Sequence, residues 1–125
     1  MADMKEKGLT LLSATTVALN AAAHTTLYTV PTGKRCILHS ALLVAGADAG
    51  ASTVSIGANG AETDFVVATS LTNLNAQYDT ALIAPLTTTS PATLKSYAAG
   101  TVLECACTTT AGGATNTVYL YGMLY

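Results

Sequence analysis

The C-terminal segment TVYLYGMLY, Thr117–Tyr125, limits the possible folds more than any other part of the sequence. Valine, tyrosine and threonine favour β-strands, in which successive side chains point to opposite faces of a sheet. One face of this strand would carry Val118, Leu120, Gly122 and Leu124. The other face would carry Tyr119, Tyr121, Met123 and Tyr125. Both faces are apolar, whereas a surface strand of an antiparallel sheet normally has one polar face, so both sides of this strand need a cover.

A second segment, RCILHSALLV at Arg35–Val44, is also apolar on both faces. Two such strands indicate that the outer face of a sheet is covered from outside the subunit, because obligate interfaces resemble a protein core cut in half. Tyrosine and methionine are also enriched at interfaces. We therefore predict an oligomer interface at Tyr119, Tyr121, Met123 and Tyr125. The alternative is a cover from within the chain, supplied by residues 9–23.

Short alternating or β-branched runs, separated by Gly, Pro, Asn and Asp, predict strands along the rest of the chain. The predicted strands are Leu9–Ser13, Thr15–Asn20, Thr25–Val30, Arg35–Val44, Ser52–Ile56, Asp64–Thr69, Thr80–Ile83, Ala92–Ser96, Val102–Thr108 and Asn116–Tyr125. The segment Val17–Ala23 could instead form a helical turn, because VALNAAA contains helix formers and lacks alternation. Many short strands at this spacing predict an all-β fold, either an antiparallel β-sandwich or a barrel. We expect one domain at residues 9–125 after a short polar arm at residues 1–8.

The low charge of the chain narrows the possible partners. Only 10% of the residues are charged, against about 25% in an ordinary soluble domain. A surface with so few charges suits packing against other protein. Five basic residues and a net charge of −2 cannot form the basic stripe that nucleic acid requires. We also expect no membrane partner, because no apolar run approaches the roughly 18 residues of a membrane helix, and we expect folding in a cytoplasm, because no secretory signal opens the sequence.

The cysteines predict neither a disulfide framework nor a metal site. Their number is odd, so Cys36, Cys105 and Cys107 cannot all pair within one chain. Cys105 and Cys107 could join Cys36 and His39 in a metal site, but no second closely spaced ligand pair completes it. We expect buried, reduced thiols that act as small hydrophobic residues, with no metal and no cofactor.

Candidate catalytic residues are few. His24 and His39 have no carboxylate nearby in the sequence, so we interpret both as structural. Glu62 and Asp64 would share one face of a strand, and paired carboxylates can serve in acid–base catalysis or hold a cation. Because they follow the turn GANG, a solvated strand edge is the preferred interpretation. Nucleophile-elbow, phosphate-loop and H-E-x-x-H motifs are absent from the sequence, so we expect no enzymatic activity.

Residues 24–35, HTTLYTVPTGKR, begin a pattern that resembles a known family. The pattern is an extended segment, V-P-x-G-K/R, a long apolar strand, a loop of small residues and the strand TVSIG. It continues in AAGTVLECACTT at residues 98–109 and in the closing strand with its glycine. This arrangement is similar to small jelly-roll structural proteins of tailed bacteriophages, which include head decoration (cement) proteins and modules of fibres.

The resemblance implies a jelly-roll homotrimer on the exterior of a phage head, assembled in the host cytoplasm, that clamps subunits of the major capsid protein. The charged residues of the arm and of the turn after VPTG are then expected to contact the capsid. They are Asp3, Lys5, Glu6, Lys7, Lys34 and Arg35. The simpler interpretations are a disordered tail for residues 1–8 and, for the lysine–arginine pair, a charged strand edge that prevents unwanted strand pairing.

A second function stays open. A phage fibre or receptor-binding module would recognise a cell-surface glycan through exposed aromatic side chains with Asp or Asn nearby. Tyr78–Asp79 and Tyr97 are the candidates for such a site. A cellular cytokine-like or lectin-like jelly roll is a more distant alternative, because such proteins are secreted and the chain opens without a secretory signal.

Overall fold

The computed structural model describes residues 9–85, 94–110 and 114–125, and these residues form strands and no helix. The strands are β1 (Thr10–Ala18), β2 (His24–Thr29), β3 (Cys36–Ala45), β4 (Thr53–Ala58), β5 (Ala61–Ser70), β6 (Thr80–Ile83), β7 (Ser96–Tyr97), β8 (Val102–Thr109) and β9 (Thr115–Leu124). Within this part of the chain, nothing could cross a membrane as a helix.

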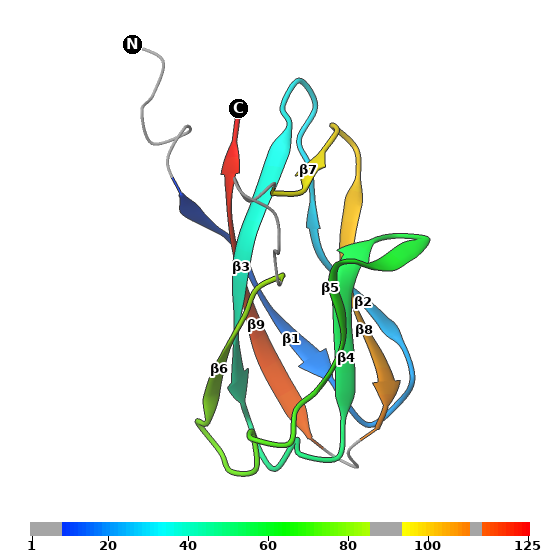
Figure 1. Cartoon of the computed structure of the whole chain (residues 1–125), viewed down its shortest axis with the longest axis vertical. Helices are drawn as coiled ribbons and strands as arrows, with labels where there is room; N and C mark the ends of the chain where they lie inside the picture. Colours follow the sequence, from blue (N-terminus) through cyan, green and yellow to red (C-terminus); the bar gives the residue numbers. More distant parts are fainter. Residues whose placement is uncertain (1–8, 86–93, 111–113) are drawn as a thin grey trace.

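Two antiparallel sheets lie face to face (Figure 1). The first sheet has the strand order β1-β9-β3-β6, and the short β7 also pairs with β3. The second sheet has the order β2-β8-β4-β5. The predicted all-β antiparallel sandwich is therefore confirmed.

Most of the strand pairs join distant parts of the sequence. β1 pairs with β9 and β2 pairs with β8, so the two ends of the described chain lie side by side. β4 and β5 form a hairpin within the second sheet. Because the two sheets share one core, every strand contributes its inward-facing side chains to the same apolar layer.

The core fills the space between the sheets. Its fully buried members include Leu38 and Leu43 of β3, Ile56 of β4, Leu103 of β8 and Leu120 of β9. Burial of each such side chain contributes about 1.5–3 kcal/mol relative to an exposed one. The inward-facing residues of the C-terminal strand that were predicted from alternation, Val118 and Leu120, are both at 0% exposure.

The N-terminal part of the domain differs from the prediction. Two strands were expected at Leu9–Ser13 and Thr15–Asn20, but β1 is one continuous strand paired with β9. Ala14, which the prediction left between two strands, pairs with Tyr119, and the strand's irregularity is instead a bulge between Leu11 and Ser13. The alternative of a helical turn at Val17–Ala23 is wrong, because β1 runs through Ala18 and the residues after it form a bend.

The strand predicted at Ala92–Ser96 is only partly testable. Residues 86–93 lie outside the described residues, and the described strand in this region is the short β7. The other predicted strands are confirmed with small shifts at their ends.

One polar side chain in the core has no evident partner. Asn116 of β9 is 1% exposed, and neither atom of its amide has a hydrogen-bond partner among the described residues. An unsatisfied buried polar group costs about 1–3 kcal/mol. Leucine has the same branching at Cγ and no polar atoms. The Asn116→Leu variant should therefore raise the free energy of unfolding by about 1–2 kcal/mol, measured by urea titration. A less stable variant would show instead that a buried water or a residue outside the described ranges bonds the amide.

Candidate functional site

The outer face of the first sheet, on the side away from the core, is apolar. Strand register brings its side chains together in cross-strand pairs: Leu11 with Tyr121, Met123 with Ile37, and Leu42 with both Tyr119 and Leu82. We call this surface the outer face. Its strand positions carry no Asp, Glu, Lys or Arg within the described parts of β1, β9, β3 and β6. Such a face resembles the core of an interface more than an ordinary solvated surface.

The structure places the side chains predicted for the interface on this outer face. Tyr119, Tyr121 and Met123 are half-buried in the isolated chain, because the neighbouring strands shield only their flanks. Leu11 is 47% exposed and Leu82 is 68% exposed, so the two edges of the face are more open than its centre.

The N-terminal strand does not cover the outer face. β1 pairs edge to edge with β9 from Thr10 to Ala18, so it widens the first sheet and adds Leu11 and Ala14 to the same surface. The intrachain cover by residues 9–23 is therefore wrong. The apolar side of β9 stays accessible as far as the described residues extend.

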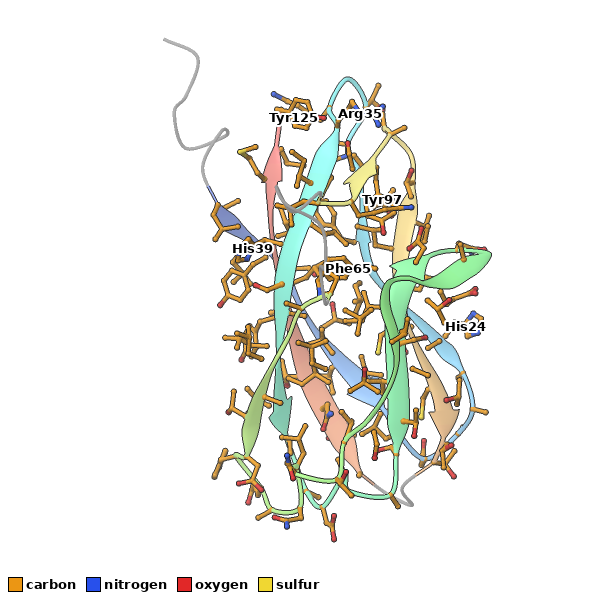
Figure 2. All side chains as sticks on the ribbon, in the orientation of Figure 1. His24, Arg35, His39, Phe65, Tyr97 and Tyr125 are labelled. Carbon is orange, nitrogen blue, oxygen red and sulfur yellow. The ribbon has the colours of Figure 1, made fainter. Side chains whose placement is uncertain are left out.

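A cluster of polar side chains lies at one end of the outer face, near the turn between β2 and β3 (Figure 2). Arg35 and Tyr125 exchange two backbone hydrogen bonds, of 2.8 and 3.0 Å. The hydroxyl of Ser96 lies 3.2 Å from the Tyr125 hydroxyl and accepts from Nε and Nη2 of Arg35, both at 3.3 Å. Hydrogen bonds from Ser96 and Arg35 lower the pKa of Tyr125. Tyr125 thus lies at the polar rim of the face, and the other three predicted residues lie nearer its centre.

The residues predicted to contact a capsid are only partly described. Asp3, Lys5, Glu6 and Lys7 lie outside the described residues. Lys34 and Arg35 follow the turn at Pro31–Gly33, and the guanidinium of Arg35 is held by Ser96. The arginine therefore has a structural role at the rim, whatever else it contacts.

The second sheet presents a different outer surface. His24 of β2, Glu62 of β5 and Glu104 of β8 lie together there, although they are far apart in the sequence. No sequence signal predicted this cluster, because strand pairing alone brings the three residues into contact. Glu62 and Asp64 were interpreted as a solvated edge, yet their side chains are only 23% and 22% exposed. The reason is that each carboxylate has its own neighbours: Glu62 lies against His24 of β2, and Asp64 lies against Tyr97 and Lys95.

Asp64 has structural partners. Its Oδ1 accepts hydrogen bonds from the Tyr97 hydroxyl at 2.8 Å and from the Ala58 amide at 3.2 Å. Lys95 Nζ lies 3.8 Å from Oδ2. Burial, and then the bond to Asp64, raises the pKa of Tyr97 far above its ordinary value. Tyr97 is therefore a neutral hydrogen-bond donor inside the domain.

The cysteines and His39, considered above as metal ligands, form no cluster of three ligand groups within the described residues. All three cysteines are buried and unpaired, as predicted. Burial raises the pKa of Cys36 to about 11 and that of Cys105 to about 12, so both stay protonated near neutral pH, and the thiolate is the reactive form. His39 is exposed on the outer face, and its Nδ1 lies 3.0 Å from the Ser40 hydroxyl.

A groove of about 480 Å³ opens between the edge strands β5 and β6. Its lining is mainly apolar and includes Phe65, Val67, Ile83 and Pro85. The charged residue in this lining is Asp64, whose carboxylate already bonds Tyr97. Among the described residues, the polar side chains of the lining are Thr63, Asp64 and Thr69.

Comparisons with known proteins give one informative likeness. No family model matches the sequence, and no curated protein sequence matches it either. Among solved structures, a chain of the "Cyanophage Pam1 capsid asymmetric unit" is similar, with a TM-score of 0.54 and 17% sequence identity. The alignment covers 92% of this chain and 84% of that chain. At this identity the likeness establishes a shared fold over nearly the whole chain.

Proposed function

We propose that this chain is a structural protein of a phage virion. In this proposal it is a head decoration protein that binds the assembled shell as a homotrimer, on the capsid exterior, and has no enzymatic activity. The observation that carries the proposal is the outer face of the first sheet, which has no charged strand position among the described residues and suits a sister subunit.

Two further observations support a phage capsid. The similar chain of known structure comes from a cyanophage capsid asymmetric unit, and the alignment covers 92% of this chain. The strand orders β1-β9-β3-β6 and β2-β8-β4-β5 make the chain cross repeatedly between the two sheets, as in a double-sheet jelly roll. Both observations agree with the jelly-roll decoration proteins that the sequence resembles.

Such a protein stabilises a capsid by linkage. It binds the assembled lattice and not the free capsid subunit, so its binding free energy adds to the stability of the shell. Three linked copies also gain from effective concentration, because binding of one copy holds the other two near their sites. In the proposed trimer the outer face joins the copies, which leaves the loop ends and the arm to contact the major capsid protein.

The rival glycan-binding function has weak support in the geometry. Tyr97 is 5% exposed and bonds Asp64, so its ring cannot serve as a platform for a sugar. The carboxylate of Asp79 accepts hydrogen bonds from the backbone amides of Asn75 and Ala76, at 3.1 and 3.0 Å. Of the predicted aromatic candidates, Tyr78 still offers an exposed ring, at 76% exposure.

Cryo-electron microscopy of virions that carry a tagged copy of the chain tests the proposal. We expect the tag at regular positions over the head, and we expect heads stripped of the protein to melt at a lower temperature. A tag confined to one vertex or to the tail tip would favour the fibre module. A chain that is absent from purified virions would contradict any virion role.

A further inference from the structure

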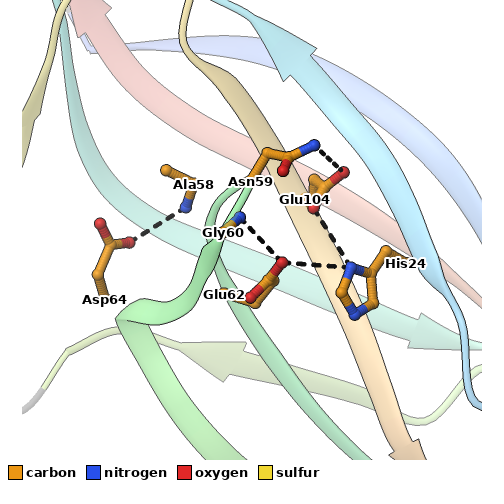
Figure 3. Close-up of polar contacts among 7 residues, drawn as sticks. All are labelled: His24, Ala58, Asn59, Gly60, Glu62, Asp64 and Glu104. Atoms are coloured by element: carbon orange, nitrogen blue, oxygen red, sulfur yellow. Dashed lines mark hydrogen bonds and ion pairs between the residues drawn. The ribbon is translucent and has the colours of Figure 1, made fainter.

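The outer surface of the second sheet holds a cluster that the proposed function does not use (Figure 3). His24 Nδ1 lies 3.3 Å from Glu62 Oε1 and 3.5 Å from Glu104 Oε1. One potential ligand atom from each residue lies within 4.8 Å of the other two. A histidine and two carboxylates thus converge from three strands on one small volume.

Strand register and a glycine build this cluster. Thr26 of β2 lies opposite Glu104 of β8, so His24, two residues earlier on the same face, is the diagonal neighbour of Glu104. Gly57 of β4 lies on the other side of Glu104. A Cβ at Gly57 would meet the Ala61 carbonyl oxygen and lie 2.8 Å from the backbone carbonyl carbon of Glu62. The missing side chain therefore lets the β4–β5 hairpin fold over this position and bring Glu62 to the cluster.

Glu104 is the unusual member of the cluster. Its side chain is 9% exposed, and its Oε1, which faces His24, has no hydrogen-bond partner among the described residues. The 3.5 Å contact with the imidazole is not a hydrogen bond of good geometry. The other oxygen, Oε2, accepts a hydrogen bond from Asn59 Nδ2 at 3.3 Å. Buried carboxylates are costly unless they are fully paired or bound to a metal, so this oxygen is suited to a cation.

The other two groups are arranged for a ligand that enters from solvent. The Gly60 amide donates to Glu62 Oε1 at 3.0 Å, and this bond is the main cause of the lowered pKa of Glu62. The His24 side chain is 53% exposed, which leaves an open side to the cluster. Within the described residues, His24 is the basic side chain that both glutamates contact.

We propose that His24, Glu62 and Glu104 bind a divalent transition-metal ion of the zinc type. Ligand atoms around tetrahedral zinc, at bonds of about 2.0–2.2 Å, lie roughly 3.4 Å apart. The two distances from His24 Nδ1, 3.3 and 3.5 Å, agree with that spacing. An imidazole with two carboxylates suits zinc, whereas calcium and magnesium prefer oxygen ligands alone. Water takes the fourth position, and the ion links β2, β8 and the β4–β5 hairpin.

This proposal departs from the expectation that the chain binds no metal. That expectation came from the spacing of the cysteines and His39, whereas the proposed ligands are His24 and two glutamates from distant segments. The site lies on the sheet opposite the outer face, so it does not depend on the proposed homotrimer.

Zinc titration of the chelator-treated protein tests the site. Isothermal calorimetry with ZnCl₂ should give one ion per chain and a rise in melting temperature. Loss of an outer partner of a metal ligand costs about 10–100-fold in metal affinity. Glu104→Gln and His24→Gln each remove a ligand itself, so each should weaken zinc binding by at least that factor. Asn59→Ala, which removes the hydrogen bond to Glu104 Oε2, should have a smaller effect in the same direction. Cobalt(II) should give an absorption spectrum without a thiolate charge-transfer band.

The control is His39→Gln, which removes an exposed histidine from the opposite sheet and should leave zinc affinity unchanged. Glu104→Gln keeps the side-chain shape and removes a buried charge, so circular dichroism should show that it stays folded. The proposal is overturned if the native chain binds less than one zinc per chain. It is also overturned if folded Glu104→Gln binds zinc as tightly as the native chain, or if cobalt reports thiolate ligands.

Discussion

The Tyr121→Asp variant should be a folded monomer of 12.6 kDa, whereas the native chain should have about three times that mass, as a closed cyclic trimer requires. Tyr121 lies on the outer face, half-buried between Leu11 of β1 and Ser40 of β3. In a monomer an aspartate at this position faces water, so the fold should persist. In the oligomer the same carboxylate would be buried without a partner, which costs about 3–5 kcal/mol in each subunit. Light scattering coupled to size exclusion measures the mass.

The matched control for this variant is Val67→Asp. Val67 lies on β5, an edge strand of the second sheet, and is 68% exposed, so an aspartate there adds the same charge on the other sheet. The control should assemble as the native chain does. A native chain that is monomeric at micromolar concentration would contradict the interface. An oligomer that persists in folded Tyr121→Asp would show that the copies meet elsewhere.

The sequence predicted well the strands that are apolar on both faces, because side-chain alternation is a local property. The inward positions of β9 were assigned correctly from alternation and from the preference of tyrosine and methionine for interfaces, and the core residues Val118 and Leu120 are fully buried. The bulge between Leu11 and Ser13 was not predictable, since it depends on how β1 meets β9. That pairing also decided whether the N-terminal segment covers β9 or extends its sheet.

The cluster on the second sheet shows the limit of sequence reasoning more clearly. His24, Glu62 and Glu104 carry no motif, because their spacing follows from the pairing of β2 with β8 and from the fold of the β4–β5 hairpin. Glu62 was noticed, but with Asp64 as its partner. The hairpin turns the two carboxylates to different neighbours, Glu62 to His24 and Asp64 to Tyr97. Residue types can be read from a sequence, whereas the partner that each of these carboxylates contacts depends on how β5 bends.

The largest loss of stability is expected from Gly122→Ala. Gly122 lies in β9 with Thr10 of β1 on one side and Leu38 of β3 on the other. A Cβ at this position would meet the Ile37 carbonyl oxygen and lie 2.9 Å from Leu12 Cδ1. The leucine can rotate, but the carbonyl belongs to the backbone of a central strand and cannot move without breaking the sheet. The free energy of unfolding should fall by about 3 kcal/mol, at the upper end for overpacked cores.

Gly50→Ala is the control for this substitution. A Cβ there would lie 3.1 Å from Asp48 Oδ1, an atom of an exposed side chain, so the cost should stay below about 1 kcal/mol. Both substitutions are best compared by urea titration in the Tyr121→Asp background, where unfolding is not coupled to dissociation of subunits. The glycine matters for the proposed interface because Tyr121 and Met123 flank it: the close approach of β9 to β3 sets how far both side chains project from the outer face. Equal stability of the two alanine variants would mean that β9 does not approach β3 as closely as described, and the geometry of the proposed interface would then fail with it.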